Sequence, residues 1–261
     1  MSSNQASKIK KGGHDKEREF ATLIGGKQVG TNCQIKEDVI KDQTKFTAKA
    51  GKKRHQWFLN GPDKLHEFGL LSELLLNIVK SCPPLREEYL DNTKKYKLSI
   101  AKAMLSARDK LSTDKNLLLD LWKLSLFGKD KVEYLAILDR DVWHIFYEGD
   151  VILAIIDEIK DIKTSKANHR KQFDDQKITF INSNGLVMAE IEVRKSTNCY
   201  SCYYPKLLFT SLVVRILPVL QKINKTEYLT LEGGTLKGTL TGEKMAFYGK
   251  AISFINKILG I

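Results

Sequence analysis

The order of helix-like and strand-like segments constrains the fold of this chain most. A helical section spans residues 61–130, with helical periodicity over 65–79, 86–110 and 116–127 and a break at Pro83-Pro84. Strand-like segments precede it at 38–40, 45–49 and 56–59 and follow it at 134–138, 143–147 and 151–156. Because strands on both sides of a helical section must share a core with it, we expect an α/β fold, with a mixed central β-sheet flanked by helices.

The N-terminal residues 1–13 are polar and lysine-rich, which predicts a basic flexible arm. A helix is expected to begin at His14 or Asp15 and to end at Gly25-Gly26, with Phe20 and its neighbours on the inward face. Glu17 falls on the same face. An inward carboxylate usually means a paired or functional group.

The last third of the chain predicts a polar loop over 161–175 and a hairpin over 177–194 that turns at Asn184-Gly185. Helices are expected over 207–223 and 249–259. We therefore expect a single domain over 14–261, in which 14–60 form a helix and hairpin and 131–261 complete the sheet.

The net charge of +12, with a pI of about 9.4, favours a polyanionic partner, nucleic acid first. The excess of positive charge lies at the two ends of the chain: the net charge is +7 for residues 1–60, −2 for 61–160 and +7 for 161–261. A basic protein without such a partner stays an equal alternative on charge alone.

The sequence argues against several other classes of protein. No apolar stretch reaches the length of a membrane span, and no signal core precedes residue 20. Cys199 and Cys202 form a single Cys-x-x-Cys without further zinc ligands, so we interpret them as reduced thiols in a cytoplasmic protein. A phosphate-binding loop of the Gly-x-x-x-x-Gly-Lys-Ser/Thr type is absent, and no nucleotide cofactor is expected.

The hairpin over 38–49 carries the chemistry. Asp38 opens one strand and Lys49 lies on the next, so the two side chains can meet at one edge of the sheet. A carboxylate that holds a divalent cation and a lysine beside the attacking water suit phosphodiester hydrolysis. Glu17 on the preceding helix can supply a further ligand. An ordinary surface hairpin is the alternative, because the pattern is loose.

These segments resemble the PD-(D/E)xK nucleases, specifically type II restriction endonucleases, through Asp15–Phe20, Lys36–Ile40 and Phe46–Lys53. The resemblance covers roughly the first 60 residues. It implies that Asp38 binds Mg²⁺, that Lys49 activates the water and that Glu17 is the helix carboxylate, with Glu19 as a possible substitute. Thr47 stands where the family usually has an acid. The resemblance further implies a homodimer that cleaves double-stranded DNA in a prokaryotic cytoplasm.

A second charged strand contains Glu190, Glu192 and Arg194 on one face. It could serve as a further acidic site or as a solvated face, and we favour a role in gripping DNA. The residues expected to contact DNA are Lys36, Lys52, Lys53, Arg54, Lys163, Lys166, Asn168, Arg170, Lys171, Gln172, Arg194 and Lys195. A repair or structure-specific nuclease and a non-catalytic DNA-binding protein remain the alternative functions.

Overall fold

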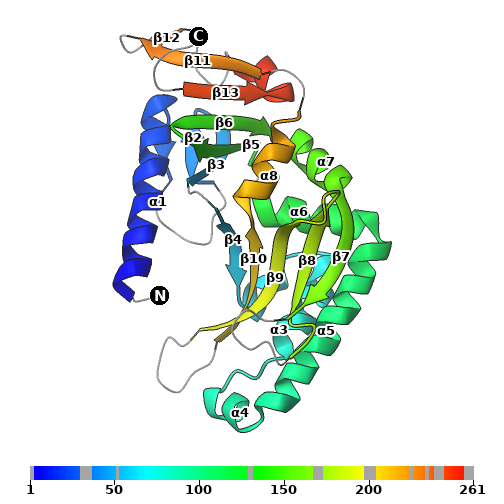
Figure 1. The fold of residues 1–261 in the computed structure, drawn as a ribbon. Coiled ribbons are helices and arrows are strands. Elements are labelled where there is room, and N and C mark those ends of the chain that lie inside the picture. The colour runs from blue at the N-terminus through cyan, green and yellow to red at the C-terminus, as the bar shows by residue number, and fades with distance from the viewer. Residues whose placement is uncertain are drawn as a thin grey trace. The chain divides into compact units, whose positions relative to one another are not determined.

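The chain forms two compact units in the computed structural model, and each unit is assembled from separate segments of the chain (Figure 1). The structure describes residues 3–29, 37–50, 53–128, 132–166, 173–196, 204–223, 226–232, 235–237 and 244–255. The first unit comprises Met1–Lys53, Leu126–Ile155 and Ile216–Ile261, and the second comprises Arg54–Ser125 and Ile156–Arg215. The sequence predicted one domain over these residues.

The first unit is built on an eight-stranded sheet. Its elements are α1 (Ser3–Leu23), β1 (Lys27–Gln28), β2 (Val39–Lys41), β3 (Thr44–Ala50), β5 (Tyr134–Asp139), β6 (Val142–Tyr147), β11 (Thr226–Glu232), β12 (Thr235–Lys237), β13 (Lys244–Tyr248) and the 3₁₀ helix η1 (Gly249–Phe254). The strand order is β1-β2-β3-β5-β6-β13-β11-β12. β3 pairs with β5, and β6 with β13, in parallel, whereas the other neighbours are antiparallel. The predicted mixed sheet with flanking helices is thus confirmed.

One face of this sheet packs against α1 and η1. Phe20 of α1 lies 5.5 Å from the ring of Phe46 on β3 and 4.7 Å from that of Trp143 on β6. All three side chains are buried, and aromatic pairs at these separations add to the burial of apolar surface. The contacts hold α1 against β3, next to the hairpin that the sequence singled out.

The second unit is built on a five-stranded antiparallel sheet with the order β4-β10-β9-β8-β7. Its elements are β4 (His55–Asn60), α2 (Pro62–Leu65), α3 (Leu71–Lys80), α4 (Arg86–Asp91), α5 (Thr93–Thr113), β7 (Ile159–Ser165), β8 (Lys177–Asn182), β9 (Val187–Ser196) and β10 (Tyr204–Ser211). α5 contacts β7 and β8, and α3 contacts β10. Three helices cross a boundary between the units: α6 (Lys115–Phe127), α7 (Glu148–Glu158) and α8 (Val213–Leu220).

Trp122 of α6 anchors the helical section to this second sheet. Its ring lies 5.4 Å from that of Phe180 on β8 and 5.0 Å from that of Phe209 on β10, and all three side chains are fully buried. The predicted helical section is present as α2–α6, and the hairpin around Gly185, whose φ is +72°, forms β8 and β9. No helix in the described part of the chain is both long and apolar enough to cross a membrane.

Four expectations about single elements were wrong. α1 begins at Ser3, not at His14, because the polar segment is rich in good helix formers and Gly12-Gly13 costs only about 1 kcal/mol per residue. Residues 151–156, expected as a strand, belong to α7. The expected loop over 161–175 begins with strand β7, and the expected helix over 207–223 is divided between β10 and α8.

Candidate functional site

Asp38 lies directly before β2, at the end of the β2–β3 hairpin. Val39 pairs with Phe46, and the backbone N–H of Asp38 donates to the carbonyl of Phe46 at 2.8 Å. The Oδ2 atom of Asp38 accepts the next hydrogen bond, from the N–H of Ala48 at 2.8 Å. The carboxylate therefore accepts a hydrogen bond from the β3 backbone just before β2 begins, which fixes its position against β3.

Lys49 and Asp38 are in direct contact. The Nζ atom of Lys49 donates to Oδ2 of Asp38 at 2.7 Å, and the two side chains are 20% and 17% exposed. Such an ion pair is shielded from water yet open to a ligand. The hairpin therefore brings together the two residues that the sequence predicted to be catalytic.

Thr47 lies next to the Asp38 carboxylate. Its side chain is fully buried, and its hydroxyl donates to Oδ2 of Asp38 at 3.0 Å. Thr47 thus orients the Asp38 carboxylate and adds no charge. All three donors share Oδ2, so Oδ1 is the oxygen that a ligand can bind.

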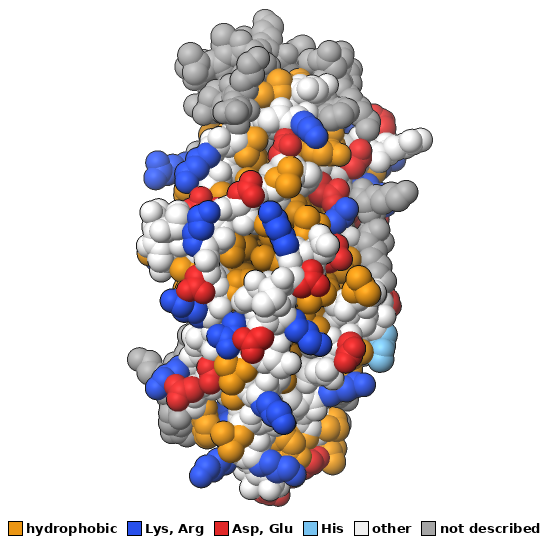
Figure 2. All heavy atoms as spheres, turned by 90° about the vertical axis from the view of Figure 1, so that its right-hand side faces the viewer, with side chains coloured by type: hydrophobic (Ala, Val, Ile, Leu, Met, Phe, Trp, Pro, Cys, Tyr) orange, Lys and Arg blue, Asp and Glu red, His pale blue; other side chains and the backbone are white. Residues whose placement is uncertain are grey.

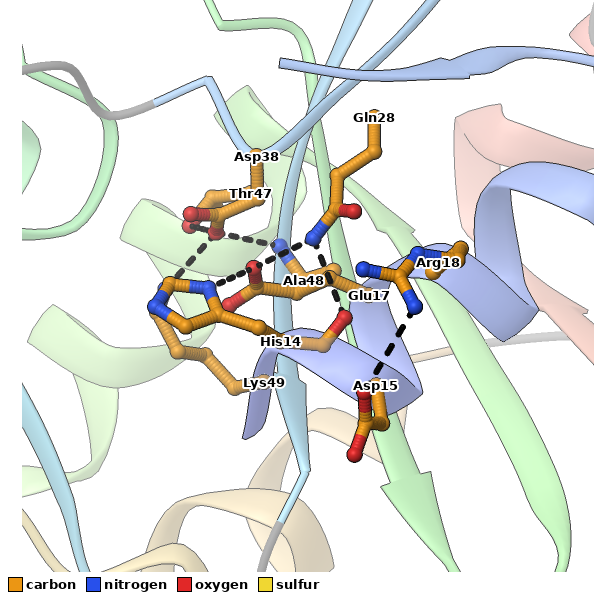
Figure 3. A network of polar contacts seen from close by, with 9 residues as sticks. All are labelled: His14, Asp15, Glu17, Arg18, Gln28, Asp38, Thr47, Ala48 and Lys49. Carbon is orange, nitrogen blue, oxygen red and sulfur yellow. Dashed lines mark hydrogen bonds and ion pairs between the residues drawn. The ribbon is translucent and has the colours of Figure 1, made fainter. Parts of the chain in front are cut away.

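Glu17 belongs to a second group of polar contacts, drawn with the first in Figure 3. Its Oε2 atom accepts hydrogen bonds from Nδ1 of His14 at 2.9 Å and from Nε2 of Gln28 at 3.3 Å. Gln28 of β1 is the cross-strand partner of Val39, the residue after Asp38. Glu17 is therefore tied to the end of β2 at which Asp38 lies.

Glu19 differs from Glu17 in its surroundings. It is ion-paired with Lys16 at 2.6 Å, and both side chains are more than 40% exposed. Between the two glutamates that the sequence offered as the helix carboxylate, Glu17 is the one that bonds to β1. The sequence analysis treated His14 only as a helix start and did not consider Gln28, although the i, i+3 spacing of His14 and Glu17 is a signal for their contact.

The residues at this site fit a hydrated Mg²⁺ ion better than an all-protein metal cage. No group of three or more His, Cys, Asp or Glu side chains is placed to hold a metal ion within the described ranges. Mg²⁺, however, is usually bound by one or two carboxylates, with water and substrate phosphate as the other ligands. Asp38 can supply one such carboxylate through Oδ1, and Glu17 is the second acid of the site.

The residues expected to bind DNA are spread over both units. Lys53 and Arg194 are exposed, whereas Lys163 pairs with Asp161 at 2.9 Å and Lys166 with Asp174 at 3.2 Å. Such exposed pairs contribute little to stability and can exchange for phosphate. Outside the described residues lie Lys36, Lys52, Asn168, Arg170, Lys171, Gln172 and the side chain of Lys195.

The second charged strand forms an internal ion-pair network. Glu190 on β9 pairs with Arg54 and with Lys177 of β8, the latter at 3.2 Å, and Lys177 also lies 3.6 Å from Glu192. Lys177 is only 1% exposed, so its contacts with these carboxylates offset the cost of its burial. The two glutamates and the two basic side chains, Arg54 and Lys177, neutralise one another here. Glu190 and Glu192 are therefore part of a structural ion-pair network and do not form a free acidic site.

The face drawn in Figure 2 carries basic and acidic side chains in alternation. Among the described side chains on that face, Lys and Arg are interspersed with Asp and Glu, and they do not gather into one basic patch. The positive charge excess of the chain is therefore not concentrated there.

His144 of β6 is a packed strand histidine. Its Nδ1 atom lies 2.8 Å from the hydroxyl of Tyr248 on β13, and the side chain is buried. Burial lowers the pKa of His144, an effect that the nearby Asp139 partly offsets.

The lowered pKa of His144 predicts a loss of stability in acid. Below its ordinary pKa of about 6.5 the unfolded chain takes up a proton that the folded chain resists. The free energy of unfolding is therefore expected to fall as the pH drops from about 6.5 through the folded-state pKa. Urea unfolding at pH 7.5 and 5.5 should show a larger decrease for the wild type than for His144→Gln. Equal decreases would contradict the assignment.

Comparisons of this chain with protein-family models, with curated proteins and with solved structures find no match.

Proposed function

We propose that this protein is a type II restriction endonuclease, which hydrolyses phosphodiester bonds in double-stranded DNA at a specific sequence and requires Mg²⁺. The observation that carries the proposal is the Asp38–Lys49 ion pair on the β2–β3 hairpin, with Glu17 of α1 at the same end of β2. The fold of the first unit would then be restriction-endonuclease-like, with α1 packed on the catalytic strands.

Each residue has a chemical role in this proposal. Asp38 and Glu17 would hold the ion, and when bound Mg²⁺ would stabilise the negative charge that develops on the phosphate. Lys49, whose Nζ lies 2.7 Å from Asp38, would orient the attacking water and favour its deprotonation. Thr47 and the N–H of Ala48 hold the carboxylate so that Oδ1 faces the ligand.

The partner in this proposal is double-stranded DNA, and the net charge of +12 supports it. A homodimer would match a palindromic site through its two-fold axis. The exposed Lys53 and Arg194 are suited to phosphate and base contacts. Prokaryotic cytoplasm is the compartment in which such an enzyme would act.

Digestion of plasmid DNA tests the proposal. With Mg²⁺ the purified protein is expected to produce discrete fragments, and chelation of the metal should abolish cleavage, because the proposed mechanism relies on the metal to stabilise the transition state. A smear would indicate a nuclease without sequence preference. DNA binding with a steep salt dependence, but no nicking in Mg²⁺ or Mn²⁺, would indicate a non-catalytic DNA-binding protein and overturn the proposal.

A further inference from the structure

The strands β9 and β10 extend past the other strands of the second sheet as a two-stranded ribbon. Within the described residues, β8 pairs with β9 only as far as Glu192, and β4 pairs with β10 only from Leu207 onward. β9 and β10 continue to pair with each other as far as Ser196 and Tyr204, and Figure 1 shows these strand ends beyond their neighbours. A two-stranded ribbon is narrow enough to enter the major groove of DNA, which is roughly 12 Å wide.

The two faces of this ribbon differ in chemistry. Residues directly opposite each other share a face, so Arg194 and Lys206 lie on one face, and Val193 and Leu207 lie on the other. Leu207 is fully buried, whereas Arg194 is exposed and Lys206 is half-buried. The apolar face therefore packs on the protein, and the basic face is open to a ligand.

Arg194 and Lys206 place two positive charges at directly opposite positions. Like charges in this arrangement destabilise a pair of strands. Neither side chain has an ion pair or a hydrogen bond with another described side chain. Glu192, two residues earlier on β9 and on the same face, pairs with Lys177 at 3.6 Å instead. An anion from outside the chain could relieve the repulsion between the two groups.

We infer that Arg194 and Lys206 form a phosphate clamp on the β9–β10 ribbon, which binds one backbone phosphate of double-stranded DNA. The inference rests on the proposed function for its partner, and it adds Lys206 to the residues that the sequence indicated. The planar fork of Arg194 can bind two oxygens of a phosphate, and Lys206 can contact the same group as a compact charge. A duplex presents phosphates along both edges of the groove that such a ribbon can enter.

Binding of a fluorescent duplex to the full-length protein tests this inference, with anisotropy measured in Ca²⁺ over a range of salt concentrations. Arg194→Gln is expected to weaken binding by at least about 10-fold, because hydrogen bonds between charged groups are strong. Two duplexes of unrelated sequence should be affected equally, since a phosphate contact carries no sequence information. Lys102→Gln is the matched control. Lys102 is exposed on α5 of the same unit, so its loss removes the same charge and should leave the affinity near the wild-type value.

A variant with both Arg194→Gln and Lys206→Gln distinguishes a clamp from two independent surface charges. The two single losses share one component, the relief of repulsion between the side chains, so the double variant should weaken binding by less than their product. The slope of log affinity against log salt concentration should change by about 0.9, the value for one phosphate. A change of about 1.8, with fully multiplicative losses, would mean two separate phosphates and would refute the clamp.

Urea unfolding separates a binding role of the two residues from a structural one. Either single substitution removes the repulsion between the strands, so the urea midpoint of the free protein should rise while its DNA affinity falls. Arg194→Lys keeps the charge and should retain the salt slope of the wild type. Unchanged affinity in the double variant would overturn the inference. A loss of affinity with a lower urea midpoint would also overturn it, because the two residues would then stabilise the hairpin.

Cleavage assays separate this inference from the proposed function. If the wild type cleaves DNA in Mg²⁺ and the double variant binds and cleaves equally well, the clamp is refuted and the nuclease stands. If DNA binding depends on Arg194 and Lys206 but neither wild type nor variant cleaves in Mg²⁺ or Mn²⁺, the nuclease proposal fails and the clamp stands. A wild type that binds no duplex DNA overturns both.

Discussion

Asp38→Asn is expected to lower the rate of Mg²⁺-dependent DNA cleavage by about 10³-fold or more. A bound metal supplies several kcal/mol of transition-state stabilisation, and each 1.36 kcal/mol corresponds to a factor of about ten in rate. An amide cannot replace the charge of the carboxylate that would hold the ion. DNA binding in Ca²⁺ should persist, because the amide oxygen can still accept from Thr47 and Ala48 and the hairpin should stay in place.

Asp42→Asn is the matched control for this substitution. Asp42 lies in the turn between β2 and β3, is exposed and has a φ of +52°, a conformation that Asn adopts readily. The change removes the same charge from the same hairpin, and cleavage should stay near the wild-type rate. Initial rates on a linear duplex, measured for both variants, decide the matter. If Asp38→Asn cleaves as fast as Asp42→Asn, the assignment of Asp38 is wrong.

The central hairpin of the site could be predicted from the sequence because its information is local. The alternation of Phe46, Ala48 and their neighbours sets which side chains share a face, and the polar turn at Asp42 sets the pairing of Val39 with Phe46. The spacing of Asp38 and Lys49 then brings the two side chains to one place. Only the structure shows that Lys49, Thr47 and the N–H of Ala48 all donate to the same Oδ2 atom of Asp38.

Other features depend on contacts that a sequence pattern does not contain. The apolar run 151–156 is compatible with a buried strand or a buried helix, and α7 forms there with Glu148 and Asp150 in its first turn. From the sequence Lys177 is an ordinary strand lysine, and only the structure shows that β9 places Glu190 and Glu192 beside it. Each of the two units also combines segments that are distant in the chain, a grouping that a local sequence pattern does not contain.

His14 illustrates the same limit within the site itself. Its spacing from Glu17 suggests a contact, but only the structure shows that Gln28 joins the pair and that Nε2 stays without a partner among the described residues. Because α1 extends back to Ser3, His14 is an interior helical residue with a defined direction and not a flexible start. A helix that began at His14 or Asp15, as the sequence predicted, would not give the His14 side chain this defined direction.

Lys49→Met should lower the cleavage rate by about 10²- to 10⁴-fold, the usual range for loss of a positioned acid–base group. Methionine keeps an unbranched side chain of similar length at Lys49 but has no charge and no N–H to direct toward water. Asp38 would keep its bonds from Thr47 and Ala48, so metal binding and DNA binding in Ca²⁺ should change little. The loss should therefore appear in kcat, whereas KM for DNA stays close to the wild-type value.

Lys45→Met separates a specific role of Lys49 from a general effect of charge. Lys45 lies on the same strand and, by alternation, on the same face, but its Nζ is paired with Glu37 at 2.7 Å and not with Asp38. Both substitutions remove one positive charge from β3, so their effects on the attraction of DNA should be similar. Only Lys49→Met should reduce kcat, because Lys49 is the one of these two lysines that pairs with the carboxylate that would hold the metal. Equal losses of kcat in the two variants would show that Lys49 acts through net charge alone and has no role in activating water.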